Sequence, residues 1–297
     1  MKVSHAFAFS CSLLLSTVAA TSANAANPAG IAFSKQTNVS LYGKPTGMLI
    51  TGRCNWYATE FAAARAKGAE VLVYINPASR PDNHVCALDK LFYMNNYGAV
   101  PLWPWPTYGQ RSIFANSRMT DMRAGSKWAN YVVSYVEKLM RERKVDGVYI
   151  DVLGARPWGI SNWSNWSLTE KNAWTNGAVD LVRRLDAKRR AINPNFLIVN
   201  NNIWDRGDKT TLGYAGEKYV DGVAIEHPNG VNSYHTKYIA RAFSNLGHRR
   251  TLIIGRDATD ARAWAIVPGV THVSSQATSH YAYPTVPPIA FRALNDR

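Results

Sequence analysis

Residues 145–151 read VDGVYID, and residues 220–226 repeat the pattern as VDGVAIE. Each copy consists of an Asp-Gly pair, a short apolar run and a terminal carboxylic acid. An apolar run of this length, bounded by turn residues, is typical of a fully buried strand in a parallel sheet. If both copies belong to one such sheet, Asp151 and Glu226 stand at the same carboxyl-end edge. That is the edge where α/β barrels keep their functional residues.

Apolar strand-like runs alternate with helical stretches along the rest of the chain. The expected strands are Gly47–Thr51, Glu70–Asn76, Ala99–Trp103, Val145–Asp151, Asn195–Asn201, Asp221–Glu226, Thr251–Arg256 and Val270–Ser274. The expected helices are Thr59–Lys67, Leu88–Tyr97, Asp121–Arg143, Leu168–Ala191, a short segment around Asp208–Tyr219, Ser233–Leu246 and Ala258–Ala265. This alternation predicts an α/β protein, a closed (β/α)₈ TIM-type barrel with a single domain. Its last helix is expected to be short or irregular, because prolines interrupt the chain from residue 284 onward.

A doubly wound open sheet is the alternative fold. That fold usually carries a Gly-rich phosphate-binding turn after its first strand. Residues 52–55 read GRCN, which does not match such a turn. The barrel is therefore the favoured fold.

The first 25 residues have the features of a secretory signal peptide. Lys2 supplies the positive start, Ala6 to Val18 is mostly apolar, and residues 23–25 read ANA, a small-x-small cleavage site. The apolar stretch is too short to span a membrane comfortably. We therefore expect residues 26–297 to form the barrel domain, secreted or periplasmic after cleavage near Ala25, with no membrane anchor.

Two cysteines, Cys54 and Cys86, remain after the signal peptide is removed. In an oxidising compartment an even pair is a candidate disulfide, and the alternative is two separately buried thiols.

The formal net charge is +14, and it falls by one unit when Lys2 leaves with the signal peptide. Such a balance favours anionic partners, among them acidic polysaccharide, envelope phosphates and nucleic acid. Much of the excess, however, falls in helix-like runs, where solvated faces and helix C-termini normally carry basic residues. Charge alone therefore does not identify the substrate.

The two terminal acids are expected to point into the mouth of the barrel. Side chains alternate along a strand, so Asp151 faces the same way as Tyr149, and Glu226 the same way as Ala224. Two carboxylates that converge on one pocket suit glycoside hydrolysis, in which one is an acid and the other a base or nucleophile. The alternative is structural: Asp151 would cap a loop, and Glu226 would pair with Arg256.

Other polar and aromatic side chains near the predicted strand ends are candidates for binding a sugar. Amides offer both donors and acceptors to hydroxyl groups, and flat aromatic rings can stack on sugar faces. The alternatives are local hydrogen bonding for the asparagines and inward packing for the tryptophans. The candidate substrate-binding residues are Tyr74, Asn76, Trp103, Tyr149, Asn200, Asn202, Trp204, His227 and Arg256.

Several other catalytic classes lack their motifs in this chain. There is no HExxH or paired-His spacing, no G-x-S-x-G nucleophile elbow and no P-loop. We therefore predict neither a metal nor a cofactor.

The order of these motifs resembles the putative glycoside hydrolases of the endo-α-1,4-polygalactosaminidase-like group. The residues that carry the resemblance are VYIN at 73–76, DGVYID at 146–151, the Asn-rich stretch 200–202 and DGVAIE at 221–226. The resemblance implies a (β/α)₈ barrel with Asp151 as nucleophile or base and Glu226 as acid. The group's substrate is cationic where unacetylated, which fits poorly with a strongly basic protein, so an acidic or neutral polysaccharide is expected instead.

Three functions thus follow from the sequence, in order of preference. The first is an exported glycoside hydrolase that acts on an extracellular or envelope polysaccharide. The second is a carbohydrate-binding barrel without turnover. The third is nonspecific binding of nucleic acid by the basic surface.

Overall fold

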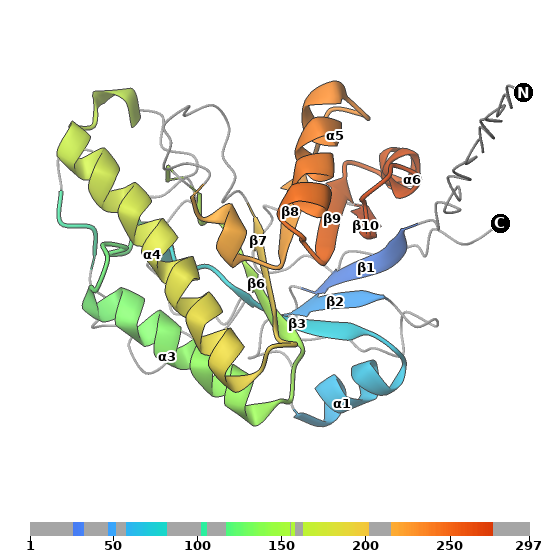
Figure 1. Cartoon of the computed structure of the whole chain (residues 1–297), viewed down its shortest axis with the longest axis horizontal. Helices are drawn as coiled ribbons and strands as arrows, with labels where there is room; N and C mark the ends of the chain where they lie inside the picture. Colours follow the sequence, from blue (N-terminus) through green and yellow to red (C-terminus); the bar gives the residue numbers. More distant parts are fainter. Residues whose placement is uncertain are drawn as a thin grey trace, which may run out of the picture.

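The computed structural model describes residues 26–32, 47–51, 58–81, 102–105, 117–154, 156–157, 163–201 and 215–275. Within them, parallel strands close into a barrel with helices on its outside (Figure 1). The strands are β1 (Asn27–Ala32), β2 (Met48–Thr51), β3 (Glu70–Ile75), β6 (Gly147–Ile150), β7 (Leu197–Asn201), β8 (Gly222–Glu226), β9 (Arg250–Gly255) and β10 (His272–Ser275). Neighbours in the barrel follow the order β1-β10-β9-β8-β7-β6-β3-β2. The predicted α/β barrel is confirmed.

Most described helices fall close to their predicted positions, but the helix predicted from Asp121 begins at Lys127, after the N-cap Ser126. The helices are α1 (Ala58–Ala66), α3 (Lys127–Glu142), α4 (Leu168–Ile192), α5 (Ser233–Ala240) and α6 (Ala258–Ala265), with the short 3₁₀ helices η4 (Trp163–Asn165) and η5 (Glu217–Tyr219) and the π-helix η6 (Arg241–Asn245). Ser126 caps α3, and a capping box of Ser167 and Glu170 starts α4. Outside the barrel, β4 (Ser79–Pro81) and β5 (Ser117–Met119) form a small antiparallel sheet.

One predicted strand does not belong to the barrel. β3 pairs directly with β6, and Leu102 of the predicted strand Ala99–Trp103 makes only an isolated antiparallel bridge to Thr120. The apolar run suggested a strand, but Pro101 and Pro104 have no N–H to donate to a ladder.

The strand missing from the prediction is β1, whose sequence NPAGIA contains Asn, Pro and Gly and has low strand propensity. β1 is a strand because it pairs with β2 and β10, and this pairing closes the barrel. The prediction includes one strand that the barrel lacks, Ala99–Trp103, and leaves out one that it has, β1, so the number of barrel strands is unchanged. Asp151 and Glu226 therefore still follow the fourth and sixth barrel strands.

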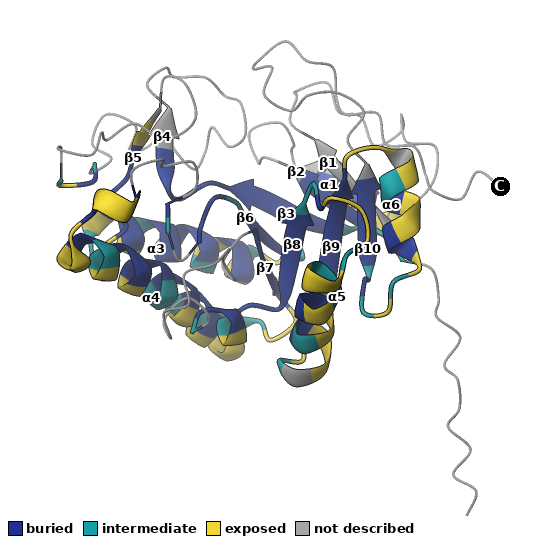
Figure 2. Ribbon diagram, turned by 90° about the horizontal axis from the view of Figure 1, so that it is seen from above, coloured by how far each residue is buried: buried dark blue, intermediate teal, exposed yellow. Residues whose placement is uncertain are grey.

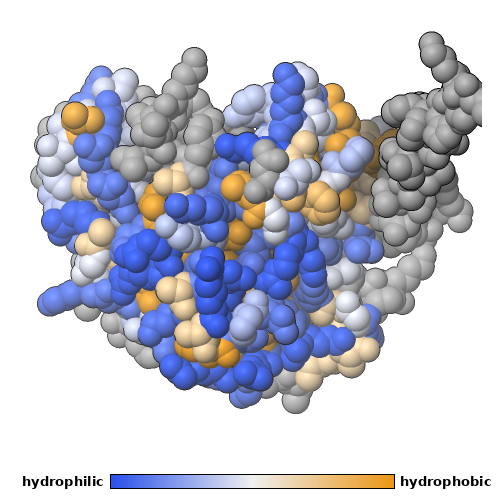
Figure 3. Space-filling model, in the orientation of Figure 1, coloured by the Kyte–Doolittle hydropathy of each residue, from blue (hydrophilic) through white to orange (hydrophobic). Residues whose placement is uncertain are grey.

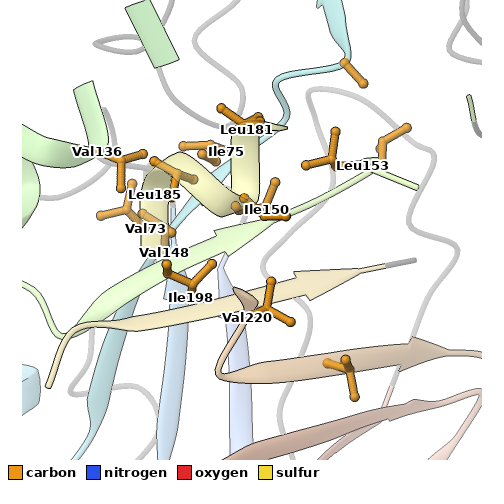
Figure 4. Packing of buried hydrophobic residues seen from close by; sticks show 14 of the residues in the cluster. Val73, Ile75, Val136, Val148, Ile150, Leu153, Leu181, Leu185, Ile198 and Val220 are labelled. Carbon is orange, nitrogen blue, oxygen red and sulfur yellow. The ribbon is translucent and has the colours of Figure 1, made fainter. Parts of the chain in front are cut away.

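Apolar side chains fill two layers, one inside the barrel and one between the barrel and its helices. Alternation along each strand divides them, so that on β6 Tyr149 points inward, whereas Val148 and Ile150 point outward. Figure 4 shows the outward set gathered with Leu181 and Leu185 of α4. Figure 2 shows that the barrel strands are buried while the exposed residues lie on the outer faces of the helices. Each buried aliphatic side chain contributes about 1.5–3 kcal/mol.

The two glycines of the repeated motif are required by close packing between strands. A Cβ on Gly147 would collide with the carbonyl oxygen of Leu197, and one on Gly222 with that of Arg250. Both glycines therefore serve the fold.

Several basic residues of α3 and α4 lie on solvated helix faces, as expected. The face seen in Figure 3 is largely hydrophilic. Exposed basic residues of α3 and α4 are paired with acids there: Arg141 lies 2.5 Å and Lys188 2.7 Å from Glu137, and Arg190 lies 2.9 Å from Asp186.

Several predicted features lie outside the described residues. They are the signal peptide at 1–25, Cys54 and Cys86, Asn202, Trp204, the helix Leu88–Tyr97 and the tail after Ser275. Among the residues that are described, no helix is both long and apolar enough to cross a membrane.

Candidate active site

Asp151 stands at the carboxyl end of β6 and is held from three sides. The Tyr74 hydroxyl of β3 donates to its Oδ2 at 2.5 Å. The Asn201 amide of β7 and the backbone N–H of Val152 both donate to its Oδ1 at 2.8 Å. All three partners are neutral donors, and they fix the orientation of the carboxyl group.

Glu226 stands at the carboxyl end of β8, at the same edge of the barrel. The Tyr149 hydroxyl donates to its Oε1 at 3.4 Å. Burial raises the pKa of Tyr149 well above its ordinary value, and the charges of Glu226 and Asp151 raise it further. Tyr149 therefore lies close to both acids.

The environment of Asp151 acts on its protonation in two directions. Burial raises the pKa of its carboxyl group, and this is the largest influence. The hydrogen bonds from Tyr74, Asn201 and the Val152 N–H lower it in part, because they favour the charged form. A carboxyl group balanced in this way is characteristic of functional sites.

The residue after each acid has a left-handed backbone. Val152 has φ of 60° and His227 has φ of 47°. This region is strained for a β-branched side chain such as that of Val152. Strained residues cluster at functional sites, where the surrounding fold holds them in place. The two copies of the motif thus end alike, with an acid followed by a sharp turn.

Two predicted binding residues, Asn76 and Asn200, have structural roles. Asn76 builds the turn after β3, since its Nδ2 donates to Ser79 and its Oδ1 accepts from the Ala78 N–H. Asn200 is fully buried and donates to the carbonyl of Ile150, because its position on β7 faces away from the barrel interior. Asn76 thus bonds locally, as the alternative interpretation has it, whereas Asn200 bonds to the backbone of a neighbouring strand.

Trp103 is a core residue, which corrects its prediction as a sugar-stacking platform. It is only 1 % exposed. Its ring lies 5.7 Å from that of Trp166 in a stacked arrangement and 5.4 Å from that of Trp174 edge-on. Large aromatic rings gain more from mutual burial than from facing water, so this loop folds inward.

Asn201 was missed as a functional candidate. It shares the inward face of β7 with Leu197 and Val199, which line the barrel interior. The alternation that oriented Asp151 also selects Asn201 rather than Asn200. Applied to β7, the same rule would have found it from the sequence.

His227 and Arg256 lie beyond Glu226 on the β8–β9 side of the edge. His227 continues the ladder, since its N–H donates to the carbonyl of Ile254 at 2.8 Å. Burial and the charge of Arg256 lower the pKa of His227, while Asp260 raises it. Arg256 is exposed, and its backbone N–H donates to Asp260.

No family model matches the chain, and no curated protein matches it either. Solved structures do. The glycoside hydrolase domain of PelA from Pseudomonas aeruginosa is similar with a TM-score of 0.54 at 13% identity, over 84% of this chain and 94% of that one. The chain has the barrel fold of glycoside hydrolase domains.

Two further solved structures share this barrel. α-L-Fucosidase isoenzyme 2 from Paenibacillus thiaminolyticus matches 84% of this chain and 46% of its own, with a TM-score of 0.51 and 10% identity. A cycloalternan-degrading enzyme from Trueperella pyogenes matches 86% of this chain and 41% of its own, with a TM-score of 0.50 and 11% identity. At these identities the likeness establishes the fold, and function depends on the site.

Proposed function

We propose that this protein is an exported glycoside hydrolase that cleaves an extracellular or envelope polysaccharide. The observation that carries the proposal is the placement of Asp151 and Glu226 at one barrel edge, with Tyr149 close to both. Two carboxyl groups at such an edge supply the acid and the base or nucleophile that glycosidic cleavage requires. The barrel shared with glycoside hydrolase domains agrees with this reaction.

The hydrogen bonds favour Asp151 as nucleophile or base and Glu226 as general acid. Three donors point at the oxygens of Asp151, and a carboxylate that accepts several donors is stabilised in its charged form. The Tyr149 hydroxyl beside Glu226 can donate or accept, so it is compatible with a protonated Glu226. Glu226 would then protonate the leaving oxygen while Asp151 acts at the anomeric carbon or on a water.

The substrate is expected to be an acidic or neutral polysaccharide. The net charge of +14, which falls by one unit when Lys2 leaves with the signal peptide, disfavours a cationic polymer. Arg256, exposed beyond Glu226, supplies a cation close to the site, and within the described residues its guanidinium makes no ion pair. With His227 it is a proposed contact for the sugar.

Export follows from the proposed cleavage after Ala25. The N–H of Ala26 donates to the carbonyl of Ala265 at 2.8 Å, and β1 begins at Asn27. Cleavage after Ala25 therefore retains all of β1, whereas cleavage a few residues later would remove a barrel strand. We expect N-terminal sequencing of the exported protein to begin at Ala26.

A reducing-end assay across a panel of acidic, neutral and cationic polysaccharides tests the activity. The wild-type protein should release reducing ends from at least one, and Asp151→Asn and Glu226→Gln should each lower the rate by about 10²- to 10⁴-fold. Asp180→Asn and Glu142→Gln, at half-buried positions of the outer helices α4 and α3, are matched controls and should keep the wild-type rate.

Near-normal hydrolysis by either acid variant would remove the assignment of roles. Polysaccharide binding with no reducing ends released would instead indicate a binding barrel without turnover. That alternative relied on the aromatic loops, and the burial of Trp103, Trp163 and Trp166 weakens it.

A further inference from the structure

Two tyrosines lie side by side inside the barrel, on the amino-terminal side of the two acids. Tyr74 of β3 and Tyr149 of β6 are direct register partners, and their rings stack with centroids 5.9 Å apart at 25°. Both side chains are buried, with 4 % and 1 % exposed. Each ring therefore holds its hydroxyl group in a fixed place.

The two hydroxyl groups serve different acids. Tyr74 reaches the adjacent strand and donates to Asp151, whereas Tyr149 donates to Glu226. Since β7 lies between β6 and β8, the second bond crosses the barrel interior. Each acid thus has its own tyrosine.

The bonds on Asp151 restrict where a proton can sit. Its Oδ1 accepts from two N–H groups, of Asn201 and Val152, and neither of these groups can accept a hydrogen bond in return. A proton can therefore be accommodated only on Oδ2, and only if the Tyr74 hydroxyl turns from donor to acceptor. In the ionised form, the remaining lone pair of Oδ2 is the one left for a substrate.

We propose that Tyr74 and Asn201 are positioning residues, which hold Asp151 as an anion and orient its Oδ2 for reaction. This inference rests on the proposed function, in which Asp151 is the base or nucleophile. Burial raises the pKa of Asp151 and so disfavours its charged form. The hydrogen bonds from Tyr74 and Asn201, together with that from the Val152 N–H, lower the pKa and favour the charged form.

The titratable groups around Asp151 come from three strands. They are Tyr74 on β3, Tyr149 on β6 and Glu226 on β8, with His227 and Arg256 beyond Glu226. Burial raises the pKa of Tyr149 well above its ordinary value, so Tyr149 acts on Asp151 as a neutral group. Tyr74 acts on the pKa of Asp151 through its hydrogen bond, which lowers it.

The pH dependence of kcat tests the proposal. Tyr74→Phe and Asn201→Ala should each move the acid limb of the profile to higher pH, because each removes a bond that lowers the pKa of Asp151. On the acid side kcat should fall about 10- to 100-fold, with KM nearly unchanged, and should recover as pH rises. A uniform loss at every pH, with no shift of the limb, would overturn the proposal.

Tyr135→Phe is a matched control, since Tyr135 is a buried tyrosine of α3 and lies outside the site. It should leave the profile unchanged. Tyr74→Phe preserves the ring, so it keeps the test open even if Asn201→Ala does not fold.

A readout that needs no activity separates this proposal from the proposed function. Carboxyl ¹³C NMR, with Asp151 assigned through Asp151→Asn, should show Asp151 titrating at higher pH in Tyr74→Phe than in wild type. An unchanged titration would overturn the positioning role, whereas a shifted titration in a protein that cleaves no polysaccharide would overturn only the proposed reaction.

Discussion

The two ends of strands β6 and β8 carry carboxylates with opposite surroundings. At the amino ends, Asp146 lies 3.0 Å from Arg65, and Asp221 lies 2.5 Å from Arg189 and 2.8 Å from Arg249. Each also accepts a backbone N–H from the neighbouring strand, at 2.9 and 3.0 Å. At the carboxyl end, by contrast, the partners of Asp151 are a hydroxyl, an amide and a backbone N–H.

The difference separates a structural carboxylate from a candidate reactive one. Arginine pairing balances the charge of an acid and uses its lone pairs to tie strands together. Neutral donors orient a carboxyl group without cancelling its charge, and burial then raises the pKa of Asp151. One strand thus carries an ion-paired structural carboxylate at its amino end and a candidate reactive group at its carboxyl end.

The largest expected effect on stability comes from removing the ion pairs of Asp221 with Arg189 and Arg249. Asp221→Asn leaves two partly buried arginines without their shared anion and should lower the free energy of unfolding by about 2–4 kcal/mol. Asp146→Asn should cost about 1 kcal/mol or less, because its partner Arg65 is 43% exposed. Urea denaturation measures both. Equal losses in the two variants would contradict the comparison.

An intermediate effect is expected at the motif's glycines. Gly222→Ala and Gly147→Ala place a Cβ against the backbone of the next strand and should each lower the free energy of unfolding by about 1–3 kcal/mol. Gly230→Ala is a control for crowding, because no atom lies within 4 Å of its added Cβ, although its positive φ adds some strain. A smaller loss at Gly147 and Gly222 than at Gly230 would show that the strands can move apart.

The smallest expected effect is a gain in stability for Asp151→Asn at neutral pH. The raised pKa of Asp151 means that the folded protein binds a proton which the unfolded chain has already released. Wild-type stability therefore falls as pH rises from the unfolded pKa to the folded one, and Asn removes this loss. The advantage of the variant should be absent below the unfolded pKa and constant above the folded one. Denaturation midpoints across pH measure it, and an advantage that grows toward acid would contradict it.

Much of the fold was predictable because its signals are local. Helix α6 was predicted with its observed bounds, and the positions of α1 and α4 were predicted to within one residue. Strand β1 was not predictable, because its pairing with β2 and β10, and not its composition, makes it a strand. Trp103 was assigned to the wrong surroundings for a similar reason, since a loop sequence does not show which rings it will meet.

By itself the sequence determined the repeated motif and its orientation. An Asp-Gly pair, a three-residue apolar run and a final acid follow one another along one strand, and alternation decides which side chains point inward. Only the tertiary structure decided what each acid meets. Tyr74, Asp151 and Asn201 are far apart in the chain, and closure of the barrel brings them within hydrogen-bonding distance. These hydrogen bonds join residues that are 77 and 50 positions apart in the chain, so they depend on which strands become neighbours when the barrel closes.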